Sequence, residues 1–243
     1  MELQNCTMPD KTLLAGNATW AAEQPTAGAT VRIQQSLLAS IEKRCLLWLA
    51  ERMPSWVNSD HLTALGFAAM LLAGATYALA SYWSPALLLV NLWLAVNWFG
   101  DSLDGTLARV RNCPRPRSGF YVDHMVDSFG ALFLLGGLAL SGYMTPWVAA
   151  TLLVSFYLLS VNAYLATYSL GTFQLSYWKF SPTELRIFLA LGNGAALLWP
   201  TVTVFSSRHP FFDVGGIGGA VCMTVVLVVS VARNTVALYR MEK

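Results

Sequence analysis

The chain has 243 residues, of which 56% are hydrophobic and only 12% are charged, and its formal net charge is +2. Together with a mean hydropathy of +0.51, this composition argues against one or two soluble domains and indicates a polytopic membrane protein. The small net charge points to no particular partner, and no nucleic-acid partner is expected.

The first part of the chain is predicted to lie outside the membrane core. Residues 1–30 are polar and include Pro25 and Gly28, so they are predicted to form a flexible tail and do not resemble a cleavable signal peptide. From 31 to 53, apolar residues recur at helical spacing opposite a charged side. The apolar stripe is too narrow to span a membrane, which predicts an amphipathic helix at the membrane interface. A helix that binds a partner protein is the alternative.

Residues 54–243 are predicted to form a six-helix transmembrane domain, which makes the fold all-α. Six segments of about 20 apolar residues support this: 61–82, 85–110, 119–140, 146–168, 183–205 and 211–238. All Lys and Arg residues except Arg208 lie before the first segment, in or beside alternate connections, or toward the C-terminal end of the chain. This asymmetry predicts that both termini are cytoplasmic.

Four aspartates stand in otherwise apolar segments near the centre of this region: Asp101, Asp104, Asp123 and Asp127. An aspartate at the centre of a spanning helix costs about 2.5 to 3.5 kcal/mol, so four of them are expected to face an aqueous or metal-filled cavity. Asp101 and Asp104 share one face of a helix, and Asp123 and Asp127 share a face of the next. The two helices are therefore predicted to present their carboxylates to a common space.

This set of carboxylates has two possible uses. Four hard oxygen donors suit Mg²⁺ or Mn²⁺, and two such ions about 3.5 to 4 Å apart form the usual arrangement for displacement at phosphorus. An acidic cluster in the ion pathway of a transporter or channel is the alternative, and the spacing alone leaves it open.

The aspartates belong to a longer pattern, D-x2-D-G-x2-A-R-x9-G-x3-D-x3-D. Its other members are Gly105, Ala108, Arg109 and Gly119. The pattern resembles the signature of the CDP-alcohol phosphotransferase (CDP-alcohol phosphatidyltransferase) family of integral membrane enzymes. These enzymes exchange the CMP of a CDP-alcohol for the hydroxyl of an acceptor, and one of the two substrates is a lipid. The resemblance also implies a homodimer.

The resemblance implies a role for each residue of the pattern. Asp101, Asp104 and Asp123 would hold two Mg²⁺ or Mn²⁺ ions. Asp127 would contribute a further ligand and act as the general base for the acceptor hydroxyl. The cytidine would lie on three small residues, Gly105, Ala108 and Gly119. Arg109 would pair with the diphosphate, and the alternative for this arginine is a positive charge that only sets topology.

Two residues ahead of the pattern also resemble the family. Asp60 and Thr63 lie in a segment that matches the family's opening segment and its nucleotide contacts. The family more often has Asn where this chain has Asp60, so a nucleotide role for the two residues is a weaker expectation.

A second possible base comes from a different part of the resemblance. His124 beside Asp123, and Glu184 after Pro182 and Thr183, resemble members that transfer phosphocholine or phosphoethanolamine to diacylglycerol. In those members a histidine working with a glutamate is a candidate base. The alternative for Glu184 is a structural role, because a carboxylate in the first turn of a helix is electrostatically favourable.

Three basic residues point to another acceptor. Lys179, Arg186 and Arg233 are expected at the cytoplasmic ends of the last spans, where members with phosphorylated acceptors keep a cationic phosphate pocket. Charges that set topology are the alternative, and the sequence does not rank the two kinds of acceptor.

The function predicted from these residues is CMP-releasing transfer of a substituted phosphate group in phospholipid biosynthesis. The donor would be a CDP-alcohol, either CDP-diacylglycerol or of the CDP-choline and CDP-ethanolamine type. A membrane transporter or cation pathway built on the aspartates is the alternative from another class. It would not need Gly105, Ala108, Arg109 and Gly119 at their fixed offsets.

Overall fold

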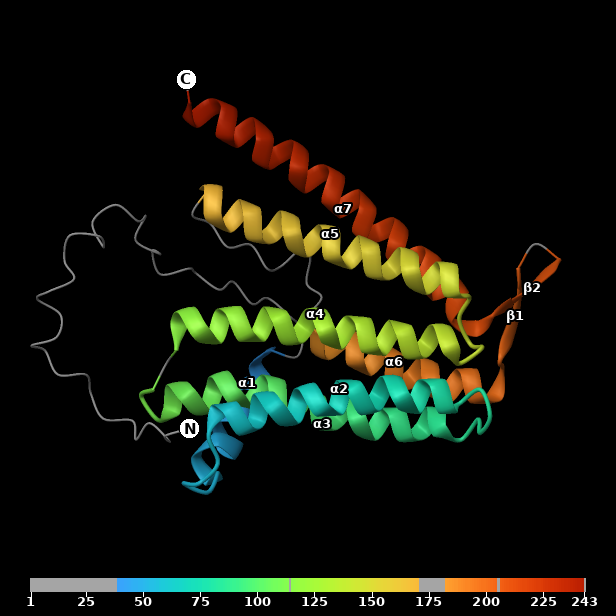
Figure 1. Ribbon diagram of the computed structural model, residues 1–243, viewed down its shortest axis with the longest axis horizontal. Coiled ribbons are helices and arrows are strands. Elements are labelled where there is room, and N and C mark those ends of the chain that lie inside the picture. The colour runs from blue at the N-terminus through green and yellow to red at the C-terminus, as the bar shows by residue number, and fades with distance from the viewer. Residues whose placement is uncertain (1–38, 114, 171–181, 205, 243) are drawn as a thin grey trace, which may run out of the picture.

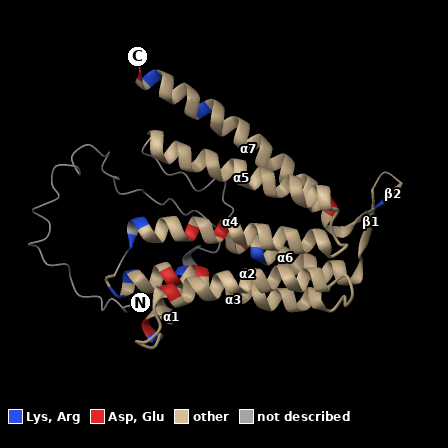
Figure 2. Ribbon diagram, in the orientation of Figure 1, with Lys and Arg blue, Asp and Glu red and all other residues tan. Residues whose placement is uncertain are grey.

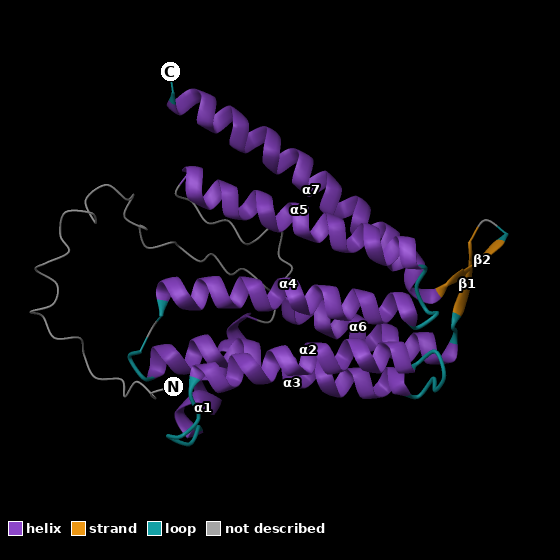
Figure 3. Ribbon diagram, in the orientation of Figure 1, coloured by secondary structure: helices purple, strands orange, loops and turns teal. Residues whose placement is uncertain are grey.

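The computed structural model describes residues 39–113, 115–170, 182–204 and 206–242, which form seven helices and one β-hairpin (Figures 1 and 3). The helices are α1 (Ala39–Arg52), α2 (Ser59–Leu79), α3 (Ala86–Val110), α4 (Pro116–Leu140), α5 (Pro146–Leu170), α6 (Pro182–Leu198) and α7 (Phe211–Met241). The hairpin consists of β1 (Thr201–Val204) and β2 (Ser207–Pro210). The predicted tail 1–30 lies outside the described residues.

Five of the helices, α2, α3, α4, α5 and α7, are long and apolar enough to cross a membrane. A helix of 20 residues spans about 30 Å, the thickness of the hydrocarbon core, and these helices have 21 to 31 residues. Five of the six predicted spans are thus confirmed as long apolar helices. The predicted boundary of the domain at residue 54 is not tested.

The predicted span 183–205 differs from the structure. Its helix α6 has 17 residues and ends at Leu198, because Pro200 follows and disfavours helical geometry in the residue before it. The chain then forms β1, which pairs with β2 in antiparallel register, with Val204 opposite Ser207. The prediction of helix is therefore wrong for residues 201–204, and a sixth span at α6 stays a prediction.

Close backbone contacts hold α2 between α3 and α4. A Cβ atom added at Gly137 of α4 would overlap the backbone of Gly74 in α2. A Cβ added at Gly100 of α3 would lie only 2.6 Å from the carbonyl oxygen of Leu62 in α2. Since no larger residue fits at either contact, these glycines let the helix axes approach and fix where α3 passes α2. Gly100 directly precedes Asp101, so the second contact positions the first aspartate.

A buried polar network attaches α6 to α2 and α3. The Tyr77 hydroxyl donates to Asn193 Oδ1 over 2.7 Å, and Asn193 Nδ2 donates to Asn91 Oδ1 over 2.7 Å. Tyr77 and Asn193 are fully buried. Because a buried polar group is costly without a partner, this network favours a single register of α6 against its neighbours.

The helix α1 lies within the segment 31–53 that was predicted to be an amphipathic helix. Its Leu46 and Ala50 are buried in a small core with Leu103 and Leu107 of α3, whereas Lys43 is exposed. One face of α1 therefore packs on the helix bundle, and its place at a membrane interface stays a prediction. The turn after α1 is held by Arg111, whose guanidinium donates to the carbonyl oxygens of residues 53, 54 and 57.

The helices α5 and α7 form a pair that runs side by side and diverges from α4 toward the C-terminal end of α7 (Figure 1). Asp213 joins the two helices at the end of the molecule that carries the hairpin. Its carboxylate accepts one hydrogen bond from the backbone N–H of Thr145 over 2.6 Å and a second from the Thr145 hydroxyl over 2.5 Å. Asp213 is only 3% exposed. Further along, Asn162 Nδ2 donates to Ser230 Oγ over 2.9 Å. These contacts explain buried polar residues that the apolar pattern did not predict.

Charged residues gather toward the end of the molecule where α3 ends and α4 begins (Figure 2). At the opposite end, the charges among the described residues are Arg208 on β2 and Asp213 at the start of α7. The two groups of Lys and Arg that the sequence predicted on opposite sides of the membrane therefore lie at opposite ends of the structure. The cytoplasmic placement of the charged end stays a prediction.

Candidate active site on α3, α4 and α6

Asp104 is the most buried of the four aspartates, with 8% of its surface exposed. Its Oδ2 accepts a hydrogen bond from the Thr63 hydroxyl over 2.6 Å, and its Oδ1 accepts from the backbone N–H of Gly105 over 2.5 Å. The Ser59 hydroxyl donates to the Asp104 carbonyl oxygen over 2.9 Å. The first turns of α2 therefore fix both the backbone and the carboxylate of this residue.

Asp101, one turn earlier on α3, forms an ion pair with Arg186 of α6. Arg186 Nη2 lies 2.5 Å from Asp101 Oδ2, and the two side chains are 15% and 32% exposed. Arg186 Nε also donates to Asn97 Oδ1 over 2.9 Å, and Asn97 Nδ2 donates to the carbonyl oxygen of Gly66 over 3.0 Å. The guanidinium is thus oriented by α3 itself, which holds Asp101 in one position.

The carboxylates of α4 share this region with those of α3. Asp127 lies within electrostatic range of Asp101, Asp104, Asp123 and Arg186. The four aspartates therefore lie in the same region of the structure. Asp123 and Asp127 are exposed and Asp101 is half-buried, so the region is open on the side of α4.

The donor set fits a divalent cation by its chemistry. Hard carboxylate oxygens are the ligands of Mg²⁺ and Mn²⁺, and four carboxylates beside one guanidinium leave an excess of negative charge. Across the part of the chain that the structure describes, no group of three or more His, Cys, Asp or Glu side chains converges closely enough to hold a metal ion. The aspartates thus face one region without meeting at one point.

The small residues of the pattern leave space beside the aspartates. A Cβ atom added at Gly105 would find nothing within 4 Å, and one added at Gly119 would meet only the Arg115 side chain at 3.9 Å. Ala108 is half-buried. Arg109 is exposed, and its Nη2 donates to the Thr106 hydroxyl over 3.2 Å. Its side chain is thus attached to its own helix at the rim of the region.

The two residues ahead of the pattern lie in different places. Thr63 belongs to the site through its hydrogen bond to Asp104. Asp60 instead forms an ion pair with Arg115 in the turn before α4, with 2.5 Å between Asp60 Oδ1 and Arg115 Nη1. Its side chain is 74% exposed. Asp60 therefore links the α2 start to the turn that connects α3 and α4.

His124 and Glu184 lie on different helices of the site. His124 Nδ1 is 2.7 Å from the Phe120 carbonyl oxygen, and its ring packs against Tyr164 of α5 with 5.0 Å between ring centroids. Since a carbonyl oxygen only accepts, Nδ1 carries the proton and Nε2 is the nitrogen that can receive one. Glu184 is half-buried in the first turn of α6, with its Oε1 atom buried.

Sequence reasoning missed some residues of this site. Asn97 lies four residues before Asp101, and this spacing on a helix is a signal that could have placed it on the same face. Arg186 was considered only as a topology charge or a phosphate ligand, and nothing local in the sequence links it to Asp101, 85 residues away. Tyr164, which packs against His124, carried no recognisable signal. Neither did Glu42, which accepts hydrogen bonds from α3 and α6.

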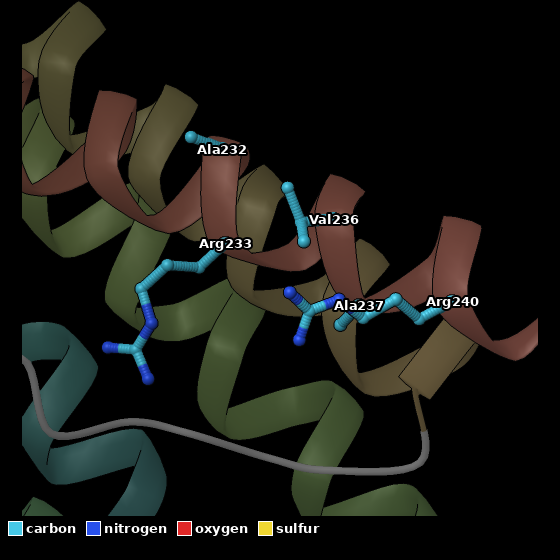
Figure 4. Close-up of a pocket in the computed structure, with 5 residues that line it drawn as sticks. All are labelled: Ala232, Arg233, Val236, Ala237 and Arg240. Carbon is cyan, nitrogen blue, oxygen red and sulfur yellow. The ribbon is translucent and has the colours of Figure 1, made fainter.

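A surface hollow of about 390 Å³ lies along the last turns of α7, and none of the four aspartates lines it. It is lined by two arginines and three apolar residues of that one helix (Figure 4): Ala232, Arg233, Val236, Ala237 and Arg240. Arg233 was expected at this end of the chain. Lys179, expected nearby, lies outside the described residues.

The fold and the site together describe a helical protein with five membrane-length helices and an acidic region shared by α3 and α4. No family model matches the chain. The chain is 26% identical to cholinephosphotransferase 1 of Bos taurus over 194 residues, which take in 72% of this chain and 46% of that protein. It thus spans about half the length of the curated relative it matches. This similarity supports a distant relationship to the CDP-alcohol phosphotransferases.

Proposed function

We propose that this protein is a membrane enzyme that transfers a substituted phosphate group from a CDP-alcohol to an acceptor hydroxyl in phospholipid biosynthesis and releases CMP. The observation that supports this most directly is the placement of Asp101, Asp104, Asp123 and Asp127 in one region of α3 and α4. The similarity to a cholinephosphotransferase supports the same reaction class. One of the two substrates would be a lipid.

The aspartates are the residues that would hold Mg²⁺ or Mn²⁺, in our proposal as two ions. Asp101, Asp104 and Asp123 would be the main ligands, with Asp127 as a further one. Such ions, when bound, neutralise the diphosphate and stabilise CMP as it leaves. Thr63 and the Gly105 N–H orient Asp104, while Arg186 and Asn97 orient Asp101. The protein's own residues thereby orient the two α3 carboxylates.

The donor would bind beside the small residues of the pattern. The open space next to Gly105 and Gly119 would take the cytidine, with Ala108 as the third small residue of this floor. Arg109, exposed at the rim, would pair with the diphosphate, where a planar guanidinium makes two parallel hydrogen bonds. Asp60, engaged with Arg115, would contribute to the nucleotide site only at its edge.

The transfer needs a base for the acceptor hydroxyl. Asp127 would take this proton as the oxygen attacks the phosphorus distal to cytidine, and the electrons of the broken P–O bond would leave with CMP. His124 Nε2 is the second candidate, because Nδ1 is directed at the Phe120 carbonyl. Glu184, at the start of α6, would assist His124 in that case.

The alcohol of the donor follows only from comparison. Two observations favour a donor of the CDP-choline or CDP-ethanolamine type. One is the name of the relative, and the other is that the chain has both His124 and a Pro-Thr-Glu sequence. CDP-diacylglycerol is the second candidate, with a soluble acceptor. Arg186 and Arg233, with Lys179, would then serve a phosphorylated acceptor.

We also propose that the aspartates lie toward the cytoplasm, where a nucleotide-activated substrate is found. The gathering of Lys and Arg at that end of the molecule supports this orientation, with both termini cytoplasmic. The working unit would be a homodimer, as in the family that the sequence pattern resembles.

The test is CMP release by the purified protein in detergent with Mg²⁺ or Mn²⁺. CDP-choline, CDP-ethanolamine and CDP-diacylglycerol are each combined with lipid and soluble acceptors, and the products are identified by mass. A matched control is Asp104→Asn, which keeps the shape of the side chain and removes its charge. Release of no CMP from any donor, together with metal-dependent flux in liposomes, would favour the transporter or cation pathway instead.

A further inference from the structure

Glu42 connects the amphipathic helix α1 to the two helices that carry the Asp101–Arg186 pair. Its Oε1 accepts a hydrogen bond from the Trp98 indole N–H of α3 over 2.8 Å and from the Thr183 hydroxyl of α6 over 2.7 Å. The Glu42 side chain is half-buried. A single carboxylate oxygen therefore joins α3 to α6 at the end of the molecule where the aspartates lie.

The two partners of Glu42 each lie close in sequence to one member of the ion pair. Trp98 lies three residues before Asp101 on α3, and Thr183 lies three residues before Arg186 on α6. On a helix this spacing puts each partner one turn from the charged residue, on nearly the same face. The Glu42 contacts and the ion pair thus fasten the same two helices, which run in opposite directions (Figure 1), and each Glu42 partner lies one turn from one member of the pair.

Glu42 itself is held in place by the packing of α1. One turn further along this helix, Leu46 packs with Leu62, Leu103 and Leu107 in a buried core. The carboxylate therefore extends from a docked helix rather than from a mobile one. By contrast Glu51, on the same helix, is exposed.

We propose that Glu42 is a positioning residue for the acidic site. It holds α3 and α6 at the spacing that lets Arg186 reach Asp101, and it acts through that pair rather than on substrate. The catalytic part of this inference rests on the proposed transferase function, whereas the positioning itself does not. It follows that α1 is a working part of the site.

The variants separate hydrogen bonding from charge. Glu42→Ala removes the acceptor, Glu42→Gln keeps an Oε1 that accepts both bonds, and Thr183→Val removes one donor. Glu51→Ala is the matched control on the exposed side of α1. All are purified in detergent as the full chain, and monodisperse elution in size-exclusion chromatography establishes that each is folded.

The first readout does not depend on activity. Hydrogen–deuterium exchange is followed in peptides that cover 182–190, the first turns of α6. We expect exchange there to be about tenfold faster in Glu42→Ala and faster to a smaller degree in Thr183→Val. Glu42→Gln and Glu51→Ala should match the wild type. Unchanged exchange in a folded Glu42→Ala, or equal effects of Ala and Gln, would overturn the proposal. If Glu42→Ala is not monodisperse, the exchange measured in Thr183→Val tests the proposal instead, and unchanged exchange in that variant would overturn it.

The second readout is CMP release in a double-mutant cycle with Arg186→Ala. If Glu42 acts through the ion pair, its removal lowers kcat about tenfold in the wild type and by less than twofold when Arg186 is already absent. If the losses of kcat caused by Glu42→Ala and Arg186→Ala simply multiply in the double mutant, Glu42 does not act through the ion pair. Should the wild type release no CMP from any donor, the proposed function fails, and the exchange measurement still decides the role of Glu42.

Discussion

The Arg186–Asp101 pair allows a quantitative test of the candidate site. Arg186→Ala removes a hydrogen bond between two charged groups and a second bond to Asn97. Both bonds involve the charged guanidinium, and a hydrogen bond to a charged group contributes about 1.5–3 kcal/mol. Because the Asp101 side chain is 32% exposed, water screens the pair, and a total of about 2 kcal/mol is the better figure. If this orientation energy is needed in the transition state, kcat/KM falls about 30-fold.

The assay is CMP release at saturating divalent metal, with each variant first shown to be monodisperse. Arg186→Lys keeps the charge but has no planar fork for two partners, so we expect about a fivefold loss. Arg208→Ala, on the hairpin at the opposite end, is the control and should stay within twofold. The reasoning is refuted if Arg186→Ala retains more than a third of wild-type kcat/KM, or if Lys and Ala have the same effect.

Three further predictions concern single residues. Asp127→Asn should abolish transfer while metal-dependent binding of the CDP-alcohol, measured by calorimetry, persists; retained turnover would remove Asp127 as the base. Arg109→Ala should raise KM for the donor several-fold, because a charge-assisted contact to the diphosphate is lost, and an unchanged KM would return this arginine to a topology role. Gly100→Ala should lower the melting temperature by several degrees, since overpacking costs about 1–3 kcal/mol where the added Cβ would lie 2.6 Å from a carbonyl oxygen of α2. The matched variant Gly136→Ala, which would meet nothing within 4 Å, should melt at or above the wild-type temperature, and the opposite order would contradict the packing argument.

The elements that sequence could predict are those that depend on local pattern. Long apolar runs located the five membrane-length helices, because hydropathy over 20 residues decides where a helix is stable in lipid. The same scale could not see that α6 ends at Leu198, since Val202 and Val204 are as apolar in a strand as in a helix. The local signal for the helix end was Pro200, and averaging hydropathy over a long segment hides the effect of a single proline.

The candidate site divides in the same way. The spacing of Asp101 with Asp104, and of Asp123 with Asp127, follows from helical periodicity, and the structure brings both pairs together. The partner of Asp101 could not be predicted, because it depends on how α6 packs against α3. Long-range contacts of this kind are set by tertiary packing, which single-sequence periodicity does not encode.

The glycine contacts of α2 restrict how a lipid could reach the aspartates. Where Gly137 meets Gly74, and again where Gly100 meets Leu62, backbones touch and leave no width for an acyl chain. Both flanks of α2 are therefore closed to hydrocarbon tails at these depths. A lipid substrate of the proposed reaction is expected to approach on the side of α4 where Asp123 and Asp127 are exposed, and its tails would remain in the bilayer while its headgroup reacts.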